Sequence, residues 1–191
     1  MTAEKEKNMI YVLLADGFEE VEALTPVDIL RRGGLSVTTV GVTGKAATGS
    51  HGIATACDVT GKDALKMLGK EPPEMLILPG GMPGTRHIDS WEGTDVFIKA
   101  TVDAGGFLAA ICAAPSVLGK RGLLSGRSAV CYPGFEKYLE GAETGNGKVV
   151  RDGKIITARG AGCAMEFALE LLRALRGDEA ARDVAKSVIY R

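Results

Sequence analysis

Short apolar segments alternate with amphipathic ones along this chain, and that alternation limits its fold more than any other feature. Residues 9–15 form a nearly continuous apolar run, which is typical of a strand buried on both faces of a parallel sheet. Residues 19–32 follow with helical spacing, and Gly33 and Gly34 stop the predicted helix. Repeated units of this kind predict an open, mostly parallel sheet with helices on both faces, which is an α/β fold.

The same alternation continues to the end of the chain. The expected strands are 35–42, 75–78 and 107–111, and the expected helices are 63–68, 94–104, 113–119, 163–175 and 178–189. We expect residues 49–58 to form a short extended excursion. Residues 148–151 and 155–158 are expected to pair as a hairpin around an Asp-Gly turn. The Gly- and Pro-rich segment 128–147 indicates no regular element.

Composition restricts the class of protein. With 191 residues, 46% of them hydrophobic, the chain can bury a full core, and we expect one domain over residues 1–191. A net charge of −1 without a basic cluster argues against nucleic acid or a membrane surface as the main partner. Residues 1–8 are a polar lead and not a signal peptide, and no apolar run approaches the roughly 20 residues that span a bilayer. We therefore expect a cytoplasmic protein.

The four cysteines encode no local metal or dithiol motif. Cys57, Cys112, Cys131 and Cys163 form no C-x-x-C pair and have no nearby His pair, so we expect no metal and no cofactor. A disulfide framework is not expected in a cytoplasmic chain of this size. A cytosolic cysteine is most often a small buried hydrophobe, and only the position of Cys112 sets it apart.

Cys112 lies between an apolar strand and a predicted helix that has Pro115 in its first turn. On such a turn the sulfur faces the unpaired N–H groups and the positive end of the helix. Both favour the thiolate and lower a thiol pKa that is ordinarily about 8.5. This arrangement is that of a nucleophile elbow, with sulfur in place of oxygen.

The carboxyl ends of parallel strands meet at one edge of a sheet, where ligands bind. Residues 15–17, Gly80 with Gly81, and Cys112 all follow predicted strands, so we expect them at the same edge. The N–H groups of Gly80, Gly81 and Ala113 could then form an oxyanion hole. An ordinary tight turn at the glycine pair remains the alternative.

Glu22 is the acidic residue that the helix dipole does not explain. Glu19 and Glu20 suit the start of the first predicted helix, whereas Glu22 shares its stripe with Pro26 and Ile29 and faces inward. A buried carboxylate without a cation takes up a proton. Beside a thiolate, such a neutral acid would donate a hydrogen bond to sulfur. A buried Glu with a purely structural partner is the alternative.

Four segments together resemble the DJ-1/ThiJ/PfpI superfamily, specifically its DJ-1 branch. They are DGFEEVEALTPVD (16–28), LPGG (78–81), AICAAP (110–115) and RGAGCAMEFA (159–168). The resemblance implies a flavodoxin-like three-layer sandwich that forms a homodimer. It also implies that Cys112 is the reactive cysteine, that Glu22 is its protonated partner, and that the N–H groups of Gly81 and Ala113 form an anion pocket.

The chain departs from the superfamily pattern at two positions. Protease-like and chaperone-like branches place a His directly after the cysteine, where this chain has Ala113, so a Cys-His protease triad is not supported. DJ-1-like members often carry His-Pro near the cysteine, and the matching pair here is Tyr132-Pro133. The histidines, His51 and His87, lie elsewhere. A general base is therefore missing from its expected place, although Tyr132 could hydrogen-bond a substrate oxygen.

His51 lies in a segment where relatives often have Arg or His near the partner subunit's site. Together with Arg32, it is a candidate to supply positive charge to a small anionic or carbonyl ligand. A solvated loop histidine is the alternative.

Two functions use the same residues. The first is a glyoxalase III-like or deglycase-type enzyme that converts a small carbonyl substrate, a 2-oxoaldehyde such as methylglyoxal, to a 2-hydroxy acid without glutathione. In this mechanism the Cys112 thiolate attacks the aldehyde and Glu22 carries the proton. The second is an oxidative-stress sensor or chaperone-like protein in which Cys112 is oxidised to a sulfinate held by Glu22.

Overall fold

The computed structural model describes residues 9–70 and 72–191, so the polar lead expected over residues 1–8 lies outside the described residues. Its centre is a seven-stranded sheet with the order β10-β11-β7-β6-β1-β2-β5. These strands are β1 (Met9–Leu14), β2 (Val37–Gly41), β5 (Val59–Thr60), β6 (Pro73–Leu78), β7 (Phe107–Ile111), β10 (Val149–Asp152) and β11 (Ile155–Ala158). All neighbours are parallel except the β10–β11 hairpin. The predicted α/β fold with a mostly parallel sheet is confirmed.

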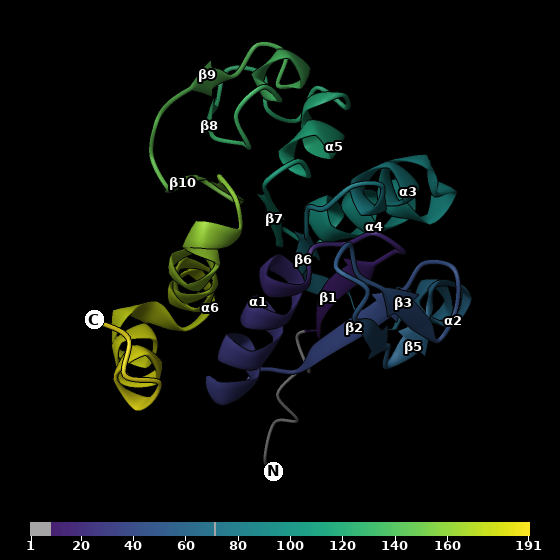
Figure 1. The fold of residues 1–191 in the computed structure, drawn as a ribbon, viewed down its shortest axis with the longest axis horizontal. Coiled ribbons are helices and arrows are strands. Elements are labelled where there is room, and N and C mark those ends of the chain that lie inside the picture. Colours follow the sequence, from purple (N-terminus) through teal and green to yellow (C-terminus); the bar gives the residue numbers. More distant parts are fainter. Residues whose placement is uncertain (1–8, 71) are drawn as a thin grey trace.

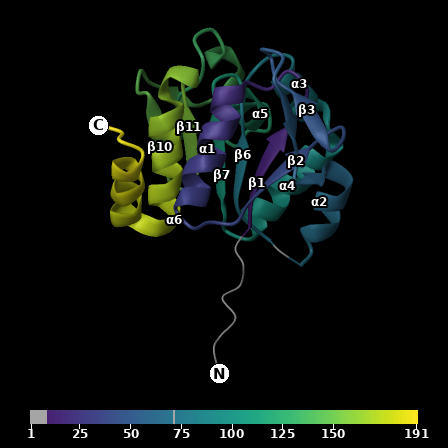
Figure 2. The ribbon, with the colours of Figure 1, turned by 60° about the horizontal axis from the view of Figure 1, so that its bottom comes forward.

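Helices cover both faces of this sheet (Figure 1). They are α1 (Glu20–Arg32), α2 (Gly61–Met67), α3 (Gly84–Ser90), α4 (Glu92–Asp103), α5 (Pro115–Gly119) and α6 (Ala164–Ser187). Figure 2 shows α1 and α6 side by side on one face. Gly177 interrupts α6 with φ 85° and ψ 176°, which separates two helical parts as the pattern predicts. Within the described chain, none of the helices combines the length and apolar character needed to cross a bilayer.

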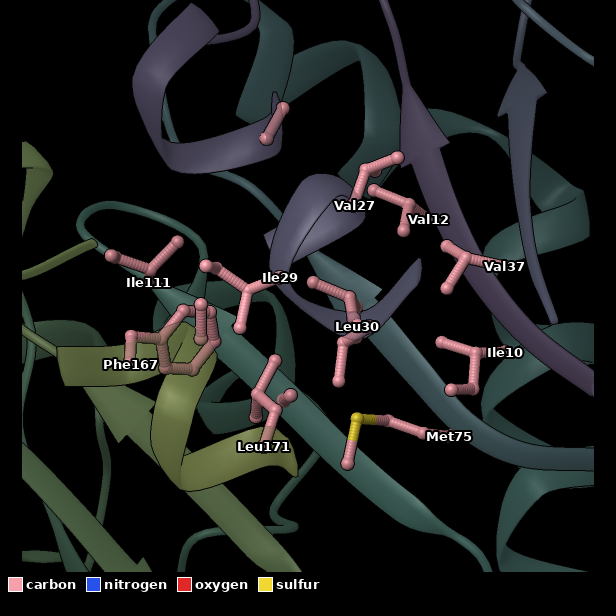
Figure 3. Packing of buried hydrophobic residues seen from close by; sticks show 14 of the residues in the cluster. Ile10, Val12, Val27, Ile29, Leu30, Val37, Met75, Ile111, Phe167 and Leu171 are labelled. Atoms are coloured by element: carbon pink, nitrogen blue, oxygen red, sulfur yellow. The ribbon is translucent and has the colours of Figure 1, made fainter. Parts of the chain in front are cut away.

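Each central strand is buried on both faces, which explains its nearly continuous apolar sequence. In β1, Ile10 and Val12 face the cluster beneath α1 and α6, where Phe167 is fully buried (Figure 3). Tyr11 and Leu13 point to the opposite face, into the cluster beneath α2 to α5. Successive side chains of a strand alternate between the two faces, so one strand supplies both halves of the core.

Two segments differ from expectation, and a third is one to which the sequence assigns no element. Helix α3 was not predicted, because a helix with Ile88 as its one buried large apolar residue shows no repeating apolar stripe. Within residues 49–58 the chain does not stay extended, since β3 (Ala46–Thr48) and β4 (Ala54–Ala56) form a separate antiparallel hairpin. Short elements also occur in the segment 128–147, namely β8 (Ser128–Ala129), β9 (Glu143–Thr144) and the 3-10 helix η1 (Glu136–Tyr138).

Strands β1, β6 and β7 are parallel neighbours, so their last residues, Leu14, Leu78 and Ile111, lie at the same edge of the sheet. The loops that follow them meet there. Gly17 accepts a hydrogen bond from Gly84, and Gly80 accepts one from Glu19. These contacts bring the candidate residues of the three loops together.

Candidate active site

Cys112 lies at a strained turn between β7 and α5. Its φ is +65°, a left-handed conformation that is uncommon for a residue other than glycine. Both of its backbone groups are held, because its N–H donates to the carbonyl of Ala158 at 2.9 Å and its carbonyl accepts from the N–H of Tyr132 at 2.8 Å. The backbone therefore fixes the direction of the side chain, as in a nucleophile elbow.

Glu22 reaches this turn from the first turn of α1, where it is 1% exposed. Glu19 caps the helix by accepting the N–H of Glu22 at 2.6 Å. The Glu22 carboxyl group accepts N–H groups of Gly80, at 3.0 Å, and of Ala161, and it is hydrogen-bonded to the side chain of Cys112. Glu22 is thus held against the sulfur from two other loops, and its inward orientation agrees with the sequence pattern.

The two glycines after β6 have different roles. The N–H groups of Gly81 and Ala113 are hydrogen-bonded to the Cys112 side chain, so they point at the place where a substrate oxyanion would form. The N–H of Gly80 is used by Glu22 instead. The prediction that Gly80 donates to an oxyanion is therefore wrong.

Gly80 positions Glu22, and the absence of a side chain is what allows the close approach. A Cβ on Gly80 would lie 2.6 Å from the Cβ of Cys112 and would collide with Oε2 of Glu22. The direction of the N–H depends on backbone angles, such as the φ of +90° at Gly81, and a glycine pair in a sequence does not reveal them.

The pKa of the Glu22 carboxyl group lies close to neutral pH. Burial raises the pKa of its carboxyl group to about 7 and the charge of Glu19 adds to this, whereas the hydrogen bonds from Cys112, Gly80 and Ala161 lower it. A group with this pKa can accept and return a proton near neutral pH, which is what a general acid–base catalyst needs.

The pKa of Cys112 moves in the direction opposite to the prediction. Burial and the neighbouring Glu22 carboxylate raise the pKa of the thiol to about 12, although the N–H groups of Ala113 and Gly81 lower it. Helix α5 has five residues, little more than one turn, so its dipole offsets little of this effect. The expectation of a resting thiolate is therefore wrong while Glu22 is ionised. The two side chains compete for one proton.

Tyr132 lies at the mouth of the site, with 51% of its surface exposed. Its ring packs against Gly160, at whose position a Cβ would lie 3.5 Å from the ring. The ring of His87 is held by another loop, since its Nδ1 lies 2.8 Å from the carbonyl oxygen of Asp16. Tyr132 therefore brings a hydroxyl group to the border of the site within one chain.

His51 contacts Glu20 and not Cys112. Its backbone N–H donates to Oε1 of Glu20 at 2.8 Å, and its Nδ1 lies 2.8 Å from Oε2. Burial opposes the ionisation of Glu20, but the hydrogen bonds from His51 dominate and lower its pKa to about 2. The same contact raises the pKa of His51. His51 is therefore a solvent-exposed loop histidine, as the alternative states, and its ring is paired with the buried Glu20. Its role toward a ligand of a partner subunit stays a prediction.

Glu20 has a structural role that could not be predicted from the sequence. The sequence assigns it to the helix dipole, yet it is 5% exposed and anchors the loop of Ser50 to Ile53. The two segments are about thirty positions apart, so no local pattern indicates the contact.

Arg32 does not join the site of its own chain. It lies at the last residue of α1, where its Nε pairs with Oδ2 of Asp28 at 2.7 Å on the surface. Ten residues of helix separate it from Glu22, which is about 15 Å along the axis. Arg32 therefore supplies no charge to the Cys112 site of its own chain, and its role beside a partner subunit's site stays a prediction.

One group of side chains in residues 9–70 and 72–191 brings three possible metal-ligand atoms within 4.8 Å of one another, namely those of Glu19, Glu20 and His51. The hydrogen bonds between His51 and Glu20 already account for this arrangement. This group is therefore explained without a bound metal ion.

We expect Cys112 to be the cysteine that oxidises and alkylates most readily. The other three cysteines are buried, whereas Cys112 is partly exposed and has Glu22 beside it to accept the thiol proton. Peptide mass spectrometry after limiting peroxide or iodoacetamide would measure the modified fraction at each position. Preferential modification of Cys57, Cys131 or Cys163 would remove the basis for this assignment.

Comparison with known proteins gives matches over nearly the whole chain. The family model for the DJ-1/PfpI family matches residues 8–174. The chain is 35% identical over 181 residues to protein dj-1beta of Drosophila melanogaster, covering 93% of this chain and 95% of that protein. The crystal structure of Drosophila DJ-1beta superposes with a TM-score of 0.89 at 34% identity, covering 97% and 99% of the two chains.

Two further relatives bear on chemistry. The glutathione-independent glyoxalase DJR-1.2 of Caenorhabditis elegans is 31% identical over 182 residues, covering 95% of each protein. The structure of oxidized Toxoplasma gondii DJ-1 has a TM-score of 0.89 at 32% identity, covering 96% of this chain and 98% of that one. The family match over most of the chain and the identities above 30% lead to one conclusion: this chain belongs to the DJ-1/PfpI family.

Proposed function

We propose that this protein is a cysteine-dependent glyoxalase that converts small 2-oxoaldehydes such as methylglyoxal to 2-hydroxy acids without glutathione. One observation carries the proposal. Cys112 and Glu22 are hydrogen-bonded to each other beneath the N–H groups of Gly81 and Ala113, and the pKa of Glu22 is raised to about 7. A nucleophile, a proton carrier and two oxyanion donors therefore share one site.

The first step needs no resting thiolate. As the sulfur of Cys112 bonds to the aldehyde carbon, the Glu22 carboxylate takes the thiol proton. The N–H groups of Gly81 and Ala113 stabilise the negative charge on the aldehyde oxygen. Glu22 then returns its proton to that oxygen, which gives a hemithioacetal and restores the carboxylate.

The second step moves a hydrogen between neighbouring carbons. The Glu22 carboxylate removes the proton from the former aldehyde carbon and passes it to the ketone oxygen, which gives an enediol. It then takes the proton of the other hydroxyl group and delivers it to the adjacent carbon, so that a carbonyl forms on the carbon bound to sulfur. The product is a thioester of the 2-hydroxy acid, which water hydrolyses to free Cys112. One carbon is oxidised and its neighbour is reduced, so the reaction consumes one water and needs no external oxidant or reductant.

Detection of lactate from methylglyoxal tests this proposal. We expect the purified protein, without glutathione, to form lactate faster than buffer alone, as followed by proton NMR. In deuterated water, exchange on Glu22 should place deuterium on the carbon that bears the hydroxyl. The relative from Caenorhabditis elegans is named a glutathione-independent glyoxalase, which supports the choice of this reaction for the test. The same attack on early methylglyoxal adducts would appear as deglycase activity. No lactate above the uncatalysed rate would contradict the proposal.

A redox-sensing role is the second candidate. Cys112 is the partly exposed cysteine, and the raised pKa of Glu22 leaves a proton available to donate to a sulfinate oxygen. A structural relative is described as oxidized, which fits the same chemistry. Turnover separates the two roles, because a sensor has no need to consume methylglyoxal at a useful rate.

The chain is also proposed to pair as a two-fold dimer next to the His51–Glu20 contact. Val21 and Ile53 flank this contact and are 50% and 55% exposed, which leaves apolar surface open to a second copy. Sedimentation at micromolar concentration should show a dimer, and a Val21→Asp variant should shift the equilibrium toward monomer. A wild-type monomer at that concentration would refute the pairing.

A further inference from the structure

We propose that a groove beside Cys112 selects 2-oxoaldehydes that carry a carboxylate on a short chain, and that Arg159 binds this carboxylate. The inference rests on the proposed function, because it requires that the aldehyde end reacts with Cys112. It adds a substrate class and a specificity residue to that site.

Strand register places Arg159 next to Cys112. Strands β11 and β7 are parallel, with Ala158 paired to Ile111, and the N–H of Cys112 donates to the carbonyl of Ala158 at 2.9 Å. Arg159 directly follows Ala158 at the end of β11, and Cys112 directly follows Ile111 at the end of β7. Neighbouring strands are about 4.8 Å apart, so the two residues leave the sheet side by side.

An open groove of about 410 Å³ begins at this point. Its lining residues are Tyr132, Pro133, Lys148, Arg159 and the segment 160–163. The groove adjoins the catalytic pair, because the N–H of Ala161 donates to Glu22 and a Cβ on Gly160 would lie 3.8 Å from Oε1 of Glu22. Cys112 and Glu22 lie just beyond this lining, so an acid bound in the groove would extend past Gly160 toward the sulfur.

The charges in the groove favour an anion. Arg159 is half-buried, and its side chain forms no hydrogen bond or ion pair with any residue of 9–70 or 72–191. The other charged groups nearby are occupied, since Lys148 pairs with Glu166 at 2.7 Å and Glu136 accepts the N–H of Gly134 at 2.7 Å. A partly buried guanidinium is stabilised by a carboxylate, which it can bind with two parallel N–H groups.

Reaction at one end leaves the carboxylate unchanged at the other. The substrate would place its aldehyde carbon at Cys112 and its carboxylate at Arg159, with two or three carbons between the dicarbonyl unit and the acid. The aldehyde carbon becomes the new acid and the ketone becomes the alcohol, with uptake of one water. The product is a 2-hydroxy dicarboxylate. Arg159 also offsets repulsion between the incoming anion and Glu22.

Two substrates of equal chain length test the selection. The probes are 4,5-dioxopentanoate, which carries a carboxylate, and 2-oxopentanal, which is neutral. We expect Arg159→Gln to lower the ratio of kcat/KM for the acid to kcat/KM for the neutral probe about tenfold or more. Arg159→Lys should keep part of the ratio because it keeps the charge. Lys154→Gln is the matched control, since Lys154 lies over the ring of Phe107 at the opposite end of the sheet and should leave the ratio unchanged.

A second readout does not depend on turnover. Iodoacetate and iodoacetamide have similar shapes but differ in charge, and peptide mass spectrometry gives the rate at which each alkylates Cys112. Arg159→Gln should slow iodoacetate relative to iodoacetamide, whereas Lys154→Gln should not. If the alkylation ratio depends on Arg159 but neither 2-oxoaldehyde is consumed, the proposed function fails and the anion site is supported. Equal ratios for wild type and Arg159→Gln in both assays would overturn the inference.

Discussion

Replacing Cys112 by Ser is expected to lower kcat/KM for methylglyoxal by at least about a thousandfold. The serine oxygen would occupy the same turn, held by the same backbone contacts to Ala158 and Tyr132. A hydroxyl is a far weaker acid than a thiol, so a Glu22 carboxylate with a pKa of about 7 cannot prepare it for attack. Lactate formation without glutathione, followed by NMR, gives the measurement.

The matched control is Cys57→Ser. The sulfur of Cys57 is buried and donates to the carbonyl oxygen of Thr55 at 4.0 Å, and a hydroxyl can make the same bond. This variant should keep most of the activity. A thermal melt of each variant separates lost chemistry from lost folding. A Cys112→Ser variant that retained a tenth of the wild-type rate would show that the sulfur is not the nucleophile.

Local patterns in the sequence predicted the central strands and most of the large helices. The run at β1 is apolar at every position because both of its faces are buried, and the break near Gly177 follows from a gap between two helical stripes. Helix α3 escaped prediction because it buries so few apolar side chains. Short strands such as β8 and β9 depend on partners distant in sequence, which periodicity does not show.

The sequence predicts which residues lie at the ends of the strands, and therefore which residues form the candidate site. It does not predict where individual N–H groups and side chains point. Cys112, Glu22, Gly81 and Ala113 are brought together because parallel strands end at one edge. The role of Gly80 depends on where one N–H points. The pKa of Cys112 depends on burial and on a carboxylate from another element. Neither is encoded near the residue itself.

Arg32 and Glu20 also show that local sequence patterns do not predict contacts between residues far apart in the sequence. Arg32 forms an ion pair with Asp28, four residues earlier on the same helix, and this spacing can be read from the sequence. Its distance from Cys112 depends on the length and packing of α1, which the sequence does not show. Glu20 has the position of a helix-dipole residue and is instead an acceptor for the loop at His51. Side chains on the same helix can therefore serve unrelated contacts, and only the packing of distant loops decides which.

Replacing Glu22 by Gln is expected to lower turnover of methylglyoxal by about 10²- to 10⁴-fold. The amide has a similar shape but cannot take the proton from sulfur or move it between carbons. It also has one acceptor oxygen, while the N–H groups of both Gly80 and Ala161 donate to the carboxyl group in the wild type. We therefore expect a lower melting temperature, equivalent to about 1–3 kcal/mol. Because the amide removes the carboxylate that raises the pKa of Cys112 and remains a neutral donor, sulfinate should still form on Cys112, as detected by mass spectrometry.

The dependence of the rate on pH would test whether Glu22 is the proton carrier. Below its pKa of about 7, Glu22 is protonated and cannot accept the thiol proton, so kcat/KM of the wild type should rise as the pH passes through this value. The rise should disappear in Glu22→Gln. The matched control is Glu19→Gln, which keeps an acceptor for the N–H of Glu22 and removes the charge that adds to the raised pKa. Its activity should persist with the midpoint at lower pH. An unchanged rate in Glu22→Gln would instead assign the proton to Tyr132 or to water.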